Sequence, residues 1–251
     1  MQYEIVWANA EENLRRWEER IRSLKGQADV ALLPEMCTTG FCTDHPELAE
    51  PVEGQTIVRL QRAAEEADLM VVGSYIASLP KRGKGGLLNR GFLLRPGMEP
   101  VWIDKKHLYK HGGEHLLFEA GEQQTIVEWR GAKFRFVICY DLRFPTWCRM
   151  RKDNPYDILL VSANWPAIRI QYWDVLVAAR AIENQSYIAA VNCVGTDGTG
   201  LEYNGHSIAY DTRMMPIAQL ADGEEGIRIA EFNIDKLHHF REVLPIWQDA
   251  D

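Results

Sequence analysis

The sequence contains no hydrophobic run that is long enough to cross a membrane. Its longest apolar stretches, 158–163 and 187–191, fall far short of the roughly 20 residues that a membrane-spanning helix needs. The N-terminus also lacks a basic segment followed by an apolar stretch, since Glu4 and Glu11 stand close to Met1. We therefore expect a cytoplasmic protein with no membrane partner and no secretory signal.

Basic residues are in the minority. The chain has 28 Lys and Arg against 36 Asp and Glu, which gives a formal net charge of -8. Phosphate recognition relies on clustered Lys and Arg, and their field would have to overcome this negative background. Nucleic acid is therefore a poor candidate partner.

Cysteine is scarce, and the number of cysteines is odd. An odd set in a chain without an export signal argues against a framework of disulfides. At most one cysteine is expected to have a special role, and the others should be individually replaceable at small cost in rate. The five positions are Cys37, Cys42, Cys139, Cys148 and Cys193.

The periodicity of apolar residues predicts one mixed α/β domain over residues 1–251. Strands and helices alternate early in the chain and hairpin-like strands dominate late, which favours a mixed sheet layered by helices. Helices are predicted at 11–24, 55–68 and 171–183, a Gly-rich basic turn at 81–86, and strands at 29–33, 69–74, 89–95, 133–139, 156–163, 186–193, 206–210 and 227–234.

Cys139 is the first candidate for chemistry. An apolar strand runs up to this residue and changes at once to Tyr-Asp-Leu-Arg. That pattern places the thiol at a sharp strand-to-helix bend, where the next backbone N-H is free to bind an anion. A small buried apolar cysteine is an equally good interpretation of this segment alone.

Two further candidates are Glu35 and Lys106. Glu35 lies between Pro34 and Met36 directly after an apolar strand, where a partly shielded carboxylate can carry a proton. Lys106 is the second of two adjacent lysines, one of which must point away from the other along any regular backbone. Taken singly, a solvated loop acid and a basic surface turn are the better interpretations.

Together, these segments strongly resemble the nitrilase, or carbon-nitrogen hydrolase, superfamily. The similarity extends over nearly the whole chain, and several stretches look most like the omega-amidase branch. Leu33-Pro-Glu-Met, Asp104-Lys-Lys-His-Leu and Ile138-Cys-Tyr-Asp-Leu-Arg-Phe-Pro carry the superfamily resemblance, and Ser162-Ala-Asn-Trp-Pro, Ala179-Arg-Ala-Ile-Glu-Asn-Gln and Gly195-Thr-Asp-Gly carry the branch resemblance.

The resemblance implies a four-layer α-β-β-α sandwich with a pair of mixed sheets, usually assembled as a homodimer through a helical face. Glu114 matches a second glutamate that many members use to orient the lysine and the substrate; in isolation it is a loop acid in a turn. Relative to the family, both ends of the chain are expected to be truncated, which could leave sheet edges unpaired.

The implied reaction is hydrolysis of the terminal amide of a short 2-oxo acid, such as 2-oxoglutaramate or 2-oxosuccinamate. Cys139 would attack the amide carbon, Glu35 would carry the proton, and Lys106 with the backbone N-H of Tyr140 would hold the oxyanion. The catalytic charge comes from an ammonium and backbone dipoles, so no metal or other cofactor is expected.

The substrate pocket is predicted less sharply. Arg143 is a candidate partner for a substrate carboxylate, because a guanidinium fork suits that group. An ion pair with Asp141, or with another acid that shapes the elbow, is an equally good role for the same arginine. Aromatic residues near the motifs could wall a small dry pocket, and only some of them should touch substrate. They are Phe41, Phe118, Tyr140, Phe144 and Trp165.

Four other interpretations of the sequence were considered. A papain-like enzyme would place its cysteine at a helix N-terminus with a histidine base, whereas Cys139 ends a strand. A metal site on His107, His111 and His115 is disfavoured because Gly112 interrupts the helix. An inactive scaffold, or an N-carbamoyl or aliphatic amide hydrolase with the same triad, stays open.

Overall fold

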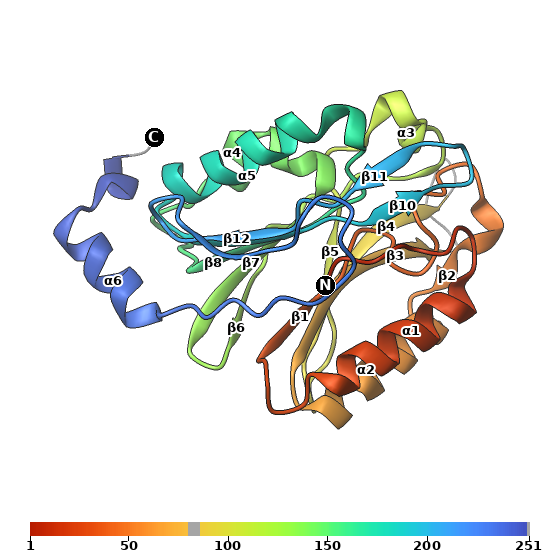
Figure 1. Cartoon of the computed structure of the whole chain (residues 1–251), viewed down its shortest axis with the longest axis horizontal. Coiled ribbons are helices and arrows are strands. Elements are labelled where there is room, and N and C mark those ends of the chain that lie inside the picture. The colour runs from red at the N-terminus through yellow and green to blue at the C-terminus, as the bar shows by residue number, and fades with distance from the viewer. Residues whose placement is uncertain (80–85, 250–251) are drawn as a thin grey trace.

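Two β-sheets stacked on each other form the centre of the molecule (Figure 1) in a computed structural model that describes residues 1–79 and 86–249. The first sheet has the order β1-β3-β4-β5, with β2 beside β3, and the second has the order β13-β12-β9-β8-β7-β6. The first sheet contains β1 (Val30–Leu32), β2 (Glu50–Pro51), β3 (Met70–Ser78), β4 (Leu87–Leu94) and β5 (Val101–Asp104). The second contains β6 (Ile126–Trp129), β7 (Ala132–Ile138), β8 (Ile158–Ser162), β9 (Tyr187–Val191), β12 (Ile208–Tyr210) and β13 (Pro216–Gln219). A separate hairpin joins β10 (Val194–Thr196) to β11 (Glu202–Asn204).

Helices cover the outer face of each sheet. Helices α1 (Ala10–Ser23) and α2 (Gln55–Ala67) lie against the first sheet, and α4 (Pro145–Cys148) and α5 (Ile170–Glu183) lie against the second (Figure 1). In α1, Leu14, Trp17 and Ile21 recur at helical spacing and are buried. The predicted four-layer α-β-β-α architecture with mixed sheets is therefore confirmed.

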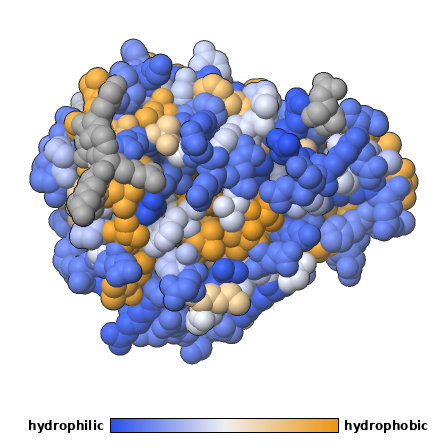
Figure 2. Space-filling view, turned by 180° about the vertical axis from the view of Figure 1, so that it is seen from behind, coloured by the Kyte–Doolittle hydropathy of each residue, from blue (hydrophilic) through white to orange (hydrophobic). Residues whose placement is uncertain are grey.

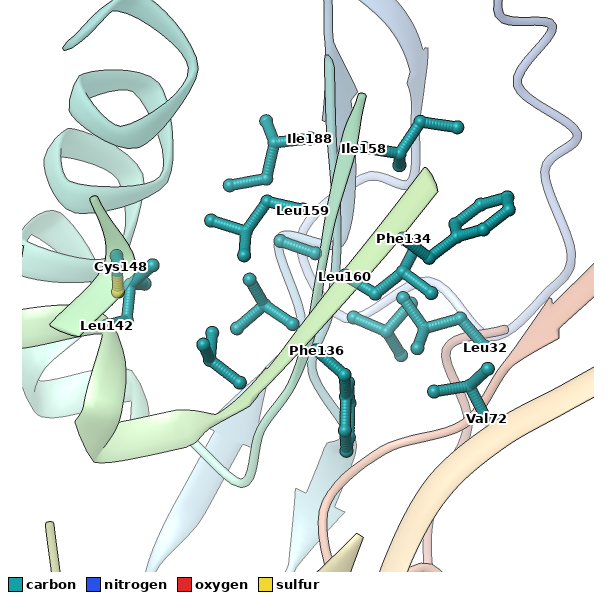
Figure 3. Packing of buried hydrophobic residues seen from close by; sticks show 14 of the residues in the cluster. Leu32, Val72, Phe134, Phe136, Leu142, Cys148, Ile158, Leu159, Leu160 and Ile188 are labelled. Carbon is teal, nitrogen blue, oxygen red and sulfur yellow. The ribbon is translucent and has the colours of Figure 1, made fainter. Parts of the chain in front are cut away.

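Apolar side chains fill the space between the two sheets. Leu32 and Val72 of the first sheet lie close to Phe136 of the second (Figure 3), and all three belong to one buried cluster. Gly91 allows this close approach, because a Cβ at that position would lie 2.5 Å from a ring carbon of Phe136. The sheets are thus held at a spacing that a larger residue at position 91 would disturb.

The predicted strand at 227–234 is wrong. Its residues alternate in polarity as a strand would, but Gly226 makes only a single bridge to Gln2, and the following segment joins no sheet. The structure instead has α6 (Ile234–Val243), which the periodicity did not predict. Buried Arg241 fixes this helix to the body through the Asp157 carboxylate and the Tyr156 carbonyl.

Short helical turns complete the fold. They are α3 (Glu114–Leu117) and the 3-10 turns η1 (Pro46–Leu48), η2 (Lys110–Gly112), η3 (Cys139–Arg143), η4 (Ala167–Arg169) and η5 (Ile246–Asp249). Residues 81–85 of the predicted Gly-rich turn lie outside the described residues. Within the described ranges, the structure has no helix that is long and apolar enough to cross a membrane. Figure 2 shows a mainly hydrophilic face with apolar residues gathered across its centre.

Strand direction brings the sequence candidates to one edge of the sandwich. In the second sheet, β7, β8 and β9 run parallel to one another. In the first sheet, β1 is parallel to β3, and both β3 and β5 are antiparallel to β4, so β1, β3 and β5 run in the same direction. Glu35 follows β1, Lys105 follows β5 and Cys139 follows β7. Carboxyl ends of such strands are where α/β proteins build their sites.

Candidate active site

A buried cluster of three charged side chains lies at this edge. The ammonium of Lys105 is 2.8 Å from Oε1 of Glu35 and 2.9 Å from Oε2 of Glu114. All three side chains are completely buried. Because an unpaired charge in such a place is very costly, both carboxylates depend on the Lys105 ammonium as their counter-charge.

The assignment of Lys106 is corrected here, since Lys105 is the lysine in the cluster. The ammonium of Lys106 instead lies 5.8 Å from the centre of the Trp147 ring, and its side chain is partly exposed. Side chains alternate along β5, so that Lys105 shares the inward face with buried Ile103, whereas Asp104 pairs with Arg90. The sequence prediction was therefore off by one residue, which places the side chain on the opposite face of the strand.

Two asparagines hold the Glu35 carboxylate in place. Asn89 donates from Nδ2 to Oε1 of Glu35 at 2.8 Å and to Oε1 of Glu114 at 3.0 Å. The backbone N-H of Asn164 donates to Oε2 of Glu35 at 3.0 Å. Both Glu35 oxygens are thus fixed by donors, which gives the carboxylate one orientation.

Glu114 is fixed as firmly as Glu35. Its Oε2 accepts the backbone N-H of Tyr109 at 2.6 Å in addition to the Lys105 ammonium. The sequence alone placed Glu114 in a turn, and it does begin the short α3 helix, but its side chain points into the cluster. This arrangement fits a group that orients Lys105.

Cys139 stands at a sharp bend between β7 and η3. Its φ angle is +45°, in the left-handed region that residues with a side chain rarely adopt. As the second residue of η3, Tyr140 has a backbone N-H with no acceptor inside its own turn. The predicted elbow geometry is therefore present.

Burial governs the acidity of this thiol. Burial raises the pKa of Cys139 well above its usual value, the nearby Glu35 carboxylate raises it further, and the Lys105 ammonium lowers it. Burial by itself would lower the pKa of Lys105, but the charges of Glu114 and Glu35 outweigh it and raise that pKa. The resting site therefore combines a neutral thiol with a lysine that stays charged.

A cavity of about 710 Å³ opens onto the thiol. Of the predicted pocket residues, Phe41, Tyr140, Arg143 and Trp165 line it. The full set of lining residues is Trp7, Phe41, Thr43, Asp44, Lys105, Tyr109, His111, Gly112, Gly113, Leu116, Leu117, Cys139, Tyr140, Arg143, Asn164, Trp165, Pro166, Arg169, Asp197, Thr199, Leu201 and Tyr203.

The placement of Phe118 and Phe144 in this pocket is wrong. Phe118 packs into a separate buried cluster with Leu87 and Met36. Phe144 stacks on the ring of His107, with 3.7 Å between ring centres. Proximity in sequence to a motif does not fix the direction of a side chain, and both aromatics support the site from outside the cavity wall.

The Arg143 guanidinium lies among aromatic rings rather than against Asp141. Its central carbon is 5.0 Å from the centre of the Trp165 ring and 5.1 Å from that of Tyr172. The Asp141 carboxylate is occupied by His107. The alternative ion pair between Arg143 and Asp141 is therefore contradicted, and Arg143 lines the cavity.

Sequence reasoning missed several residues of this site. Asn89 and Asn164 hold Glu35, and Arg169 and Tyr109 join the cavity wall. The signal for Asn164 was its position two residues after β8, an apolar strand parallel to the strand that Cys139 follows. Asn89 lies inside a strand, and nothing in its local pattern marks it.

The fold and site define a class, and comparison with known proteins names it. The chain belongs to the carbon-nitrogen hydrolase family, whose model matches residues 1–242. It is 39% identical over 251 residues to the omega-amidase YafV of Yersinia enterocolitica, covering 100% of this chain and 95% of that protein. It is 32% identical to the 2-oxoglutaramate amidase of Bacillus subtilis (strain 168), covering 99% and 95%.

A solved structure supports the same relationship. The crystal structure of XC1258 from Xanthomonas campestris, a CN-hydrolase superfamily protein with an arsenic adduct in its active site, matches with a TM-score of 0.93. The two chains are 33% identical, with 100% of this chain and 95% of that one covered. The resemblance to the nitrilase superfamily is therefore confirmed, and the chain is a cysteine-dependent carbon-nitrogen hydrolase.

Proposed function

We propose that this protein is an omega-amidase-like hydrolase that converts the terminal amide of a short 2-oxo dicarboxylic acid monoamide to the acid and ammonia. One observation carries the proposal: Glu35, Lys105 and Glu114 form a closed ionic cluster beside Cys139, at the wall of a cavity. The names of two relatives that match over nearly their whole length, an omega-amidase and a 2-oxoglutaramate amidase, support the choice of substrate.

The first half-reaction forms a thioester. Because the raised pKa keeps the Cys139 thiol neutral, Glu35 accepts its proton as the sulfur attacks the amide carbon. The Lys105 ammonium and the Tyr140 backbone N-H stabilise the negative charge that develops on the carbonyl oxygen. Glu35 then gives the proton to the nitrogen, the carbon-nitrogen bond breaks, and ammonia leaves.

The second half-reaction is hydrolysis of the thioester. Glu35, now ionised again, removes a proton from a water that attacks the same carbon. The carbon-sulfur bond breaks, the proton returns to the sulfur, and the carboxylic acid is released. Glu114 holds the Lys105 ammonium in the same position throughout, through its 2.9 Å contact. One carboxylate and one ammonium therefore serve both steps.

Arg143 is proposed to bind the carboxylate at the far end of the substrate. Its guanidinium borders the cavity beside the rings of Trp165 and Tyr172, and a guanidinium fork can give a carboxylate two parallel hydrogen bonds. Such a group suits an acid that carries charge at the end opposite its amide. Phe41 and Tyr140 supply apolar wall between the two ends.

We also propose a cytoplasmic homodimer. The outer face of α5 exposes Tyr172, Val175 and Ile182, which is more apolar surface than a solvated helix usually presents. All five cysteines are free, as expected in a reducing compartment. Light scattering on the purified protein tests the assembly: a single mass of one chain contradicts it, and Val175→Glu should convert a dimer to monomers.

An ammonia-release assay tests the activity. The purified protein is given 2-oxoglutaramate, 2-oxosuccinamate, simple aliphatic amides and N-carbamoyl amino acids, alongside a Cys139→Ala variant. Turnover of the 2-oxo acid amides that depends on Cys139 is expected, and intact-protein mass spectrometry of the wild type during turnover should detect the acyl-enzyme. A preference for carbamoyl amino acids would assign the protein to another substrate class. If none of the compounds is turned over, an inactive scaffold is favoured.

A further inference from the structure

Two arginines, Arg143 and Arg169, line the cavity that opens onto Cys139. Arg143 is the proposed partner of the substrate carboxylate, whereas Arg169 has no role in the proposed reaction. Arg169 ends the turn η4 and is only partly buried. An arginine in the wall of a cavity brings a positive charge and several N-H donors to the ligand that binds there.

Trp165 connects the two arginines. The centre of its ring lies 5.0 Å from the central guanidinium carbon of Arg143, and its Nε1 donates to the backbone carbonyl of Arg169 at 2.9 Å. Trp165 is itself buried, so its position is set by the core. The backbone of Arg169 is therefore held at a fixed place relative to the Arg143 guanidinium.

Two tyrosines of the cavity wall, Tyr109 and Tyr140, connect the guanidinium groups as well. The central guanidinium carbon of Arg169 lies 5.7 Å from the centre of the Tyr109 ring, and that of Arg143 lies 5.9 Å from the centre of the Tyr140 ring. The two rings meet edge to face, with 5.1 Å between their centres. Both positive charges therefore belong to the same part of the cavity wall.

Neither charge is matched by a carboxylate in the described part of the chain. No Asp or Glu oxygen of the described residues lies within 4.0 Å of a guanidinium nitrogen of Arg143 or Arg169. Arg90, which is also largely buried, has such a partner, because its guanidinium lies 2.7 Å from Asp104. Two guanidinium groups without a protein counter-charge in one wall indicate a ligand that is rich in oxygen and negative charge.

Two carboxylates also line the cavity, but neither is placed to bind a cation. The Asp197 carboxylate already accepts the backbone N-H groups of Thr199 and Leu201 and the hydroxyl of Tyr203. The side chain of Asp44 is 80% exposed, so water and salt screen its charge. A substrate ammonium beside the arginines would therefore be repelled, and neither carboxylate would offset that repulsion.

We propose that Arg169 is a specificity-determining residue that donates to the 2-oxo oxygen of the substrate, next to the carboxylate that Arg143 binds. This inference rests on the proposed function and deepens it, because it assigns recognition of the 2-oxo group. The oxo carbon of a 2-oxo acid is bonded directly to the carboxylate carbon, so the two groups present their oxygens side by side. Two guanidinium groups in one part of the wall suit such a pair of groups.

The charge of Arg169 should also reject glutamine. Glutamine has the chain length, the terminal amide and the carboxylate of 2-oxoglutaramate, but an ammonium stands in place of the oxo oxygen. That ammonium offers no acceptor to the Arg169 guanidinium, and like charges brought together at a binding site are unfavourable. Arg169 therefore separates two compounds whose carboxylate and amide are the same.

The experiment compares three monoamides that differ only at the carbon next to the carboxylate. They are 2-oxoglutaramate with an oxo group, glutaramate with a methylene and glutamine with an ammonium. Ammonia release gives kcat and KM of each compound for the purified wild type and for Arg169→Met, which removes the charge and the donors and keeps an unbranched side chain. In wild type, kcat/KM should be highest for 2-oxoglutaramate and lowest for glutamine.

Arg169→Met should lose the preference and keep the basal activity. Its kcat/KM for 2-oxoglutaramate should fall about tenfold to a hundredfold, mainly through KM, because a charge-assisted hydrogen bond is lost. Its kcat/KM for glutaramate, which has no oxo oxygen, should stay within about threefold of wild type. The preference for 2-oxoglutaramate over glutamine should also fall, since the repulsion of the ammonium is removed.

Arg143→Met is the matched control, because it removes the other guanidinium from the same cavity by the same substitution. The carboxylate that Arg143 binds is common to 2-oxoglutaramate and glutaramate. Both compounds should therefore lose kcat/KM by similar factors, and their ratio should stay within about twofold of wild type. Equal losses on both compounds in Arg169→Met would mean that Arg169 supports the wall or binds the carboxylate, and would overturn the inference.

Arg169→Lys repeats the measurement if the methionine variant does not fold. Lysine keeps the positive charge and loses the planar fork. This variant should still reject glutamine and should lose part of the preference for 2-oxoglutaramate over glutaramate. An unchanged preference over glutaramate would contradict a bond from Arg169 to the oxo oxygen.

The wild-type protein separates this inference from the proposed function. If wild type hydrolyses none of the three amides, or prefers glutamine, the proposed function fails and the inference fails with it. If wild type hydrolyses 2-oxoglutaramate and Arg169→Met keeps the wild-type ratio of kcat/KM between 2-oxoglutaramate and glutaramate, the inference alone is wrong.

Discussion

Oδ1 of Asp141 accepts both the backbone N-H and the ring Nδ1 of His107, each at 2.8 Å. His107 is two residues beyond Lys105, and Asp141 is two residues beyond Cys139. The same carboxylate accepts the backbone N-H of Ile138. Asp141 thus ties the segment that carries the lysine to the elbow that carries the nucleophile, although neither Asp141 nor His107 lines the cavity wall as described.

Replacement of His107 by phenylalanine tests this tie. His107→Phe keeps a ring that can stack on Phe144 and keeps the backbone bond to Asp141, but it removes the bond from Nδ1. We expect kcat to fall about tenfold with a smaller change in KM, because misplacing two reacting groups affects the transition state more than substrate binding. Steady-state kinetics and thermal unfolding measure both effects. A variant with wild-type kcat and a lowered Tm would assign the contact to stability alone.

The two lysines test the corrected assignment. Lys105→Met leaves Glu35 and Glu114 buried without their counter-charge, which costs roughly 3–5 kcal/mol of stability, and it removes the oxyanion partner. Activity should be lost. Lys106→Met removes only an ammonium over the Trp147 ring and should keep activity within about twofold. Ammonia release and chemical denaturation of both variants measure this; the reverse order of effects would restore Lys106.

The sequence could have decided between these lysines, but only in part. Val101, Trp102 and Ile103 are all apolar, so they do not show which face of the strand points inward. The polar Asp104 is the first residue that marks the outward face. Lys105 then falls on the inward face with Ile103. Glu35 and Cys139 were easier, because each follows an apolar strand directly and a sharp change of composition marks the strand end.

The cavity wall was harder to predict from the sequence. Phe144 and Tyr140 both belong to the segment around the elbow, yet one stacks on His107 and the other faces the cavity. The turn geometry after Cys139 decides between them, and local sequence does not encode it. The role of Asn164 depends on its two hydrogen bonds to Glu35, a residue 129 positions earlier in the chain, and only coordinates show such contacts.

Glu35→Gln should change turnover and thiol reactivity in opposite directions. The Glu35 carboxylate raises the pKa of Cys139, in addition to the larger effect of burial, so its removal lowers that pKa. A larger fraction of the thiol is then ionised at any given pH below the pKa. Alkylation of Cys139 by iodoacetamide, a neutral reagent, should become faster at pH 8, while amide turnover falls by at least about a hundredfold because the proton carrier is lost.

The pH profile and one control complete this test. In wild type the alkylation rate should keep rising past pH 9, because the pKa lies well above its usual value; in Glu35→Gln the rise should shift to lower pH. Cys139→Ala measures reaction of the other four cysteines, which are all buried. Unchanged alkylation in Glu35→Gln would show that the carboxylate does not act on the thiol.

Arg143→Gln should separate charged from neutral substrates. The guanidinium borders the cavity beside Trp165, and a lost charge-assisted bond to a carboxylate is worth roughly 1.5–3 kcal/mol. KM for 2-oxoglutaramate should therefore rise about tenfold to a hundredfold, whereas kcat/KM for an uncharged aliphatic amide should stay close to wild type. Arg149→Gln is the matched control: it removes a positive charge from a residue that does not line the cavity. It should leave unchanged both KM for 2-oxoglutaramate and kcat/KM for the aliphatic amide. An equal loss of kcat/KM on both substrates in Arg143→Gln would mean that the arginine supports the elbow and does not bind the carboxylate.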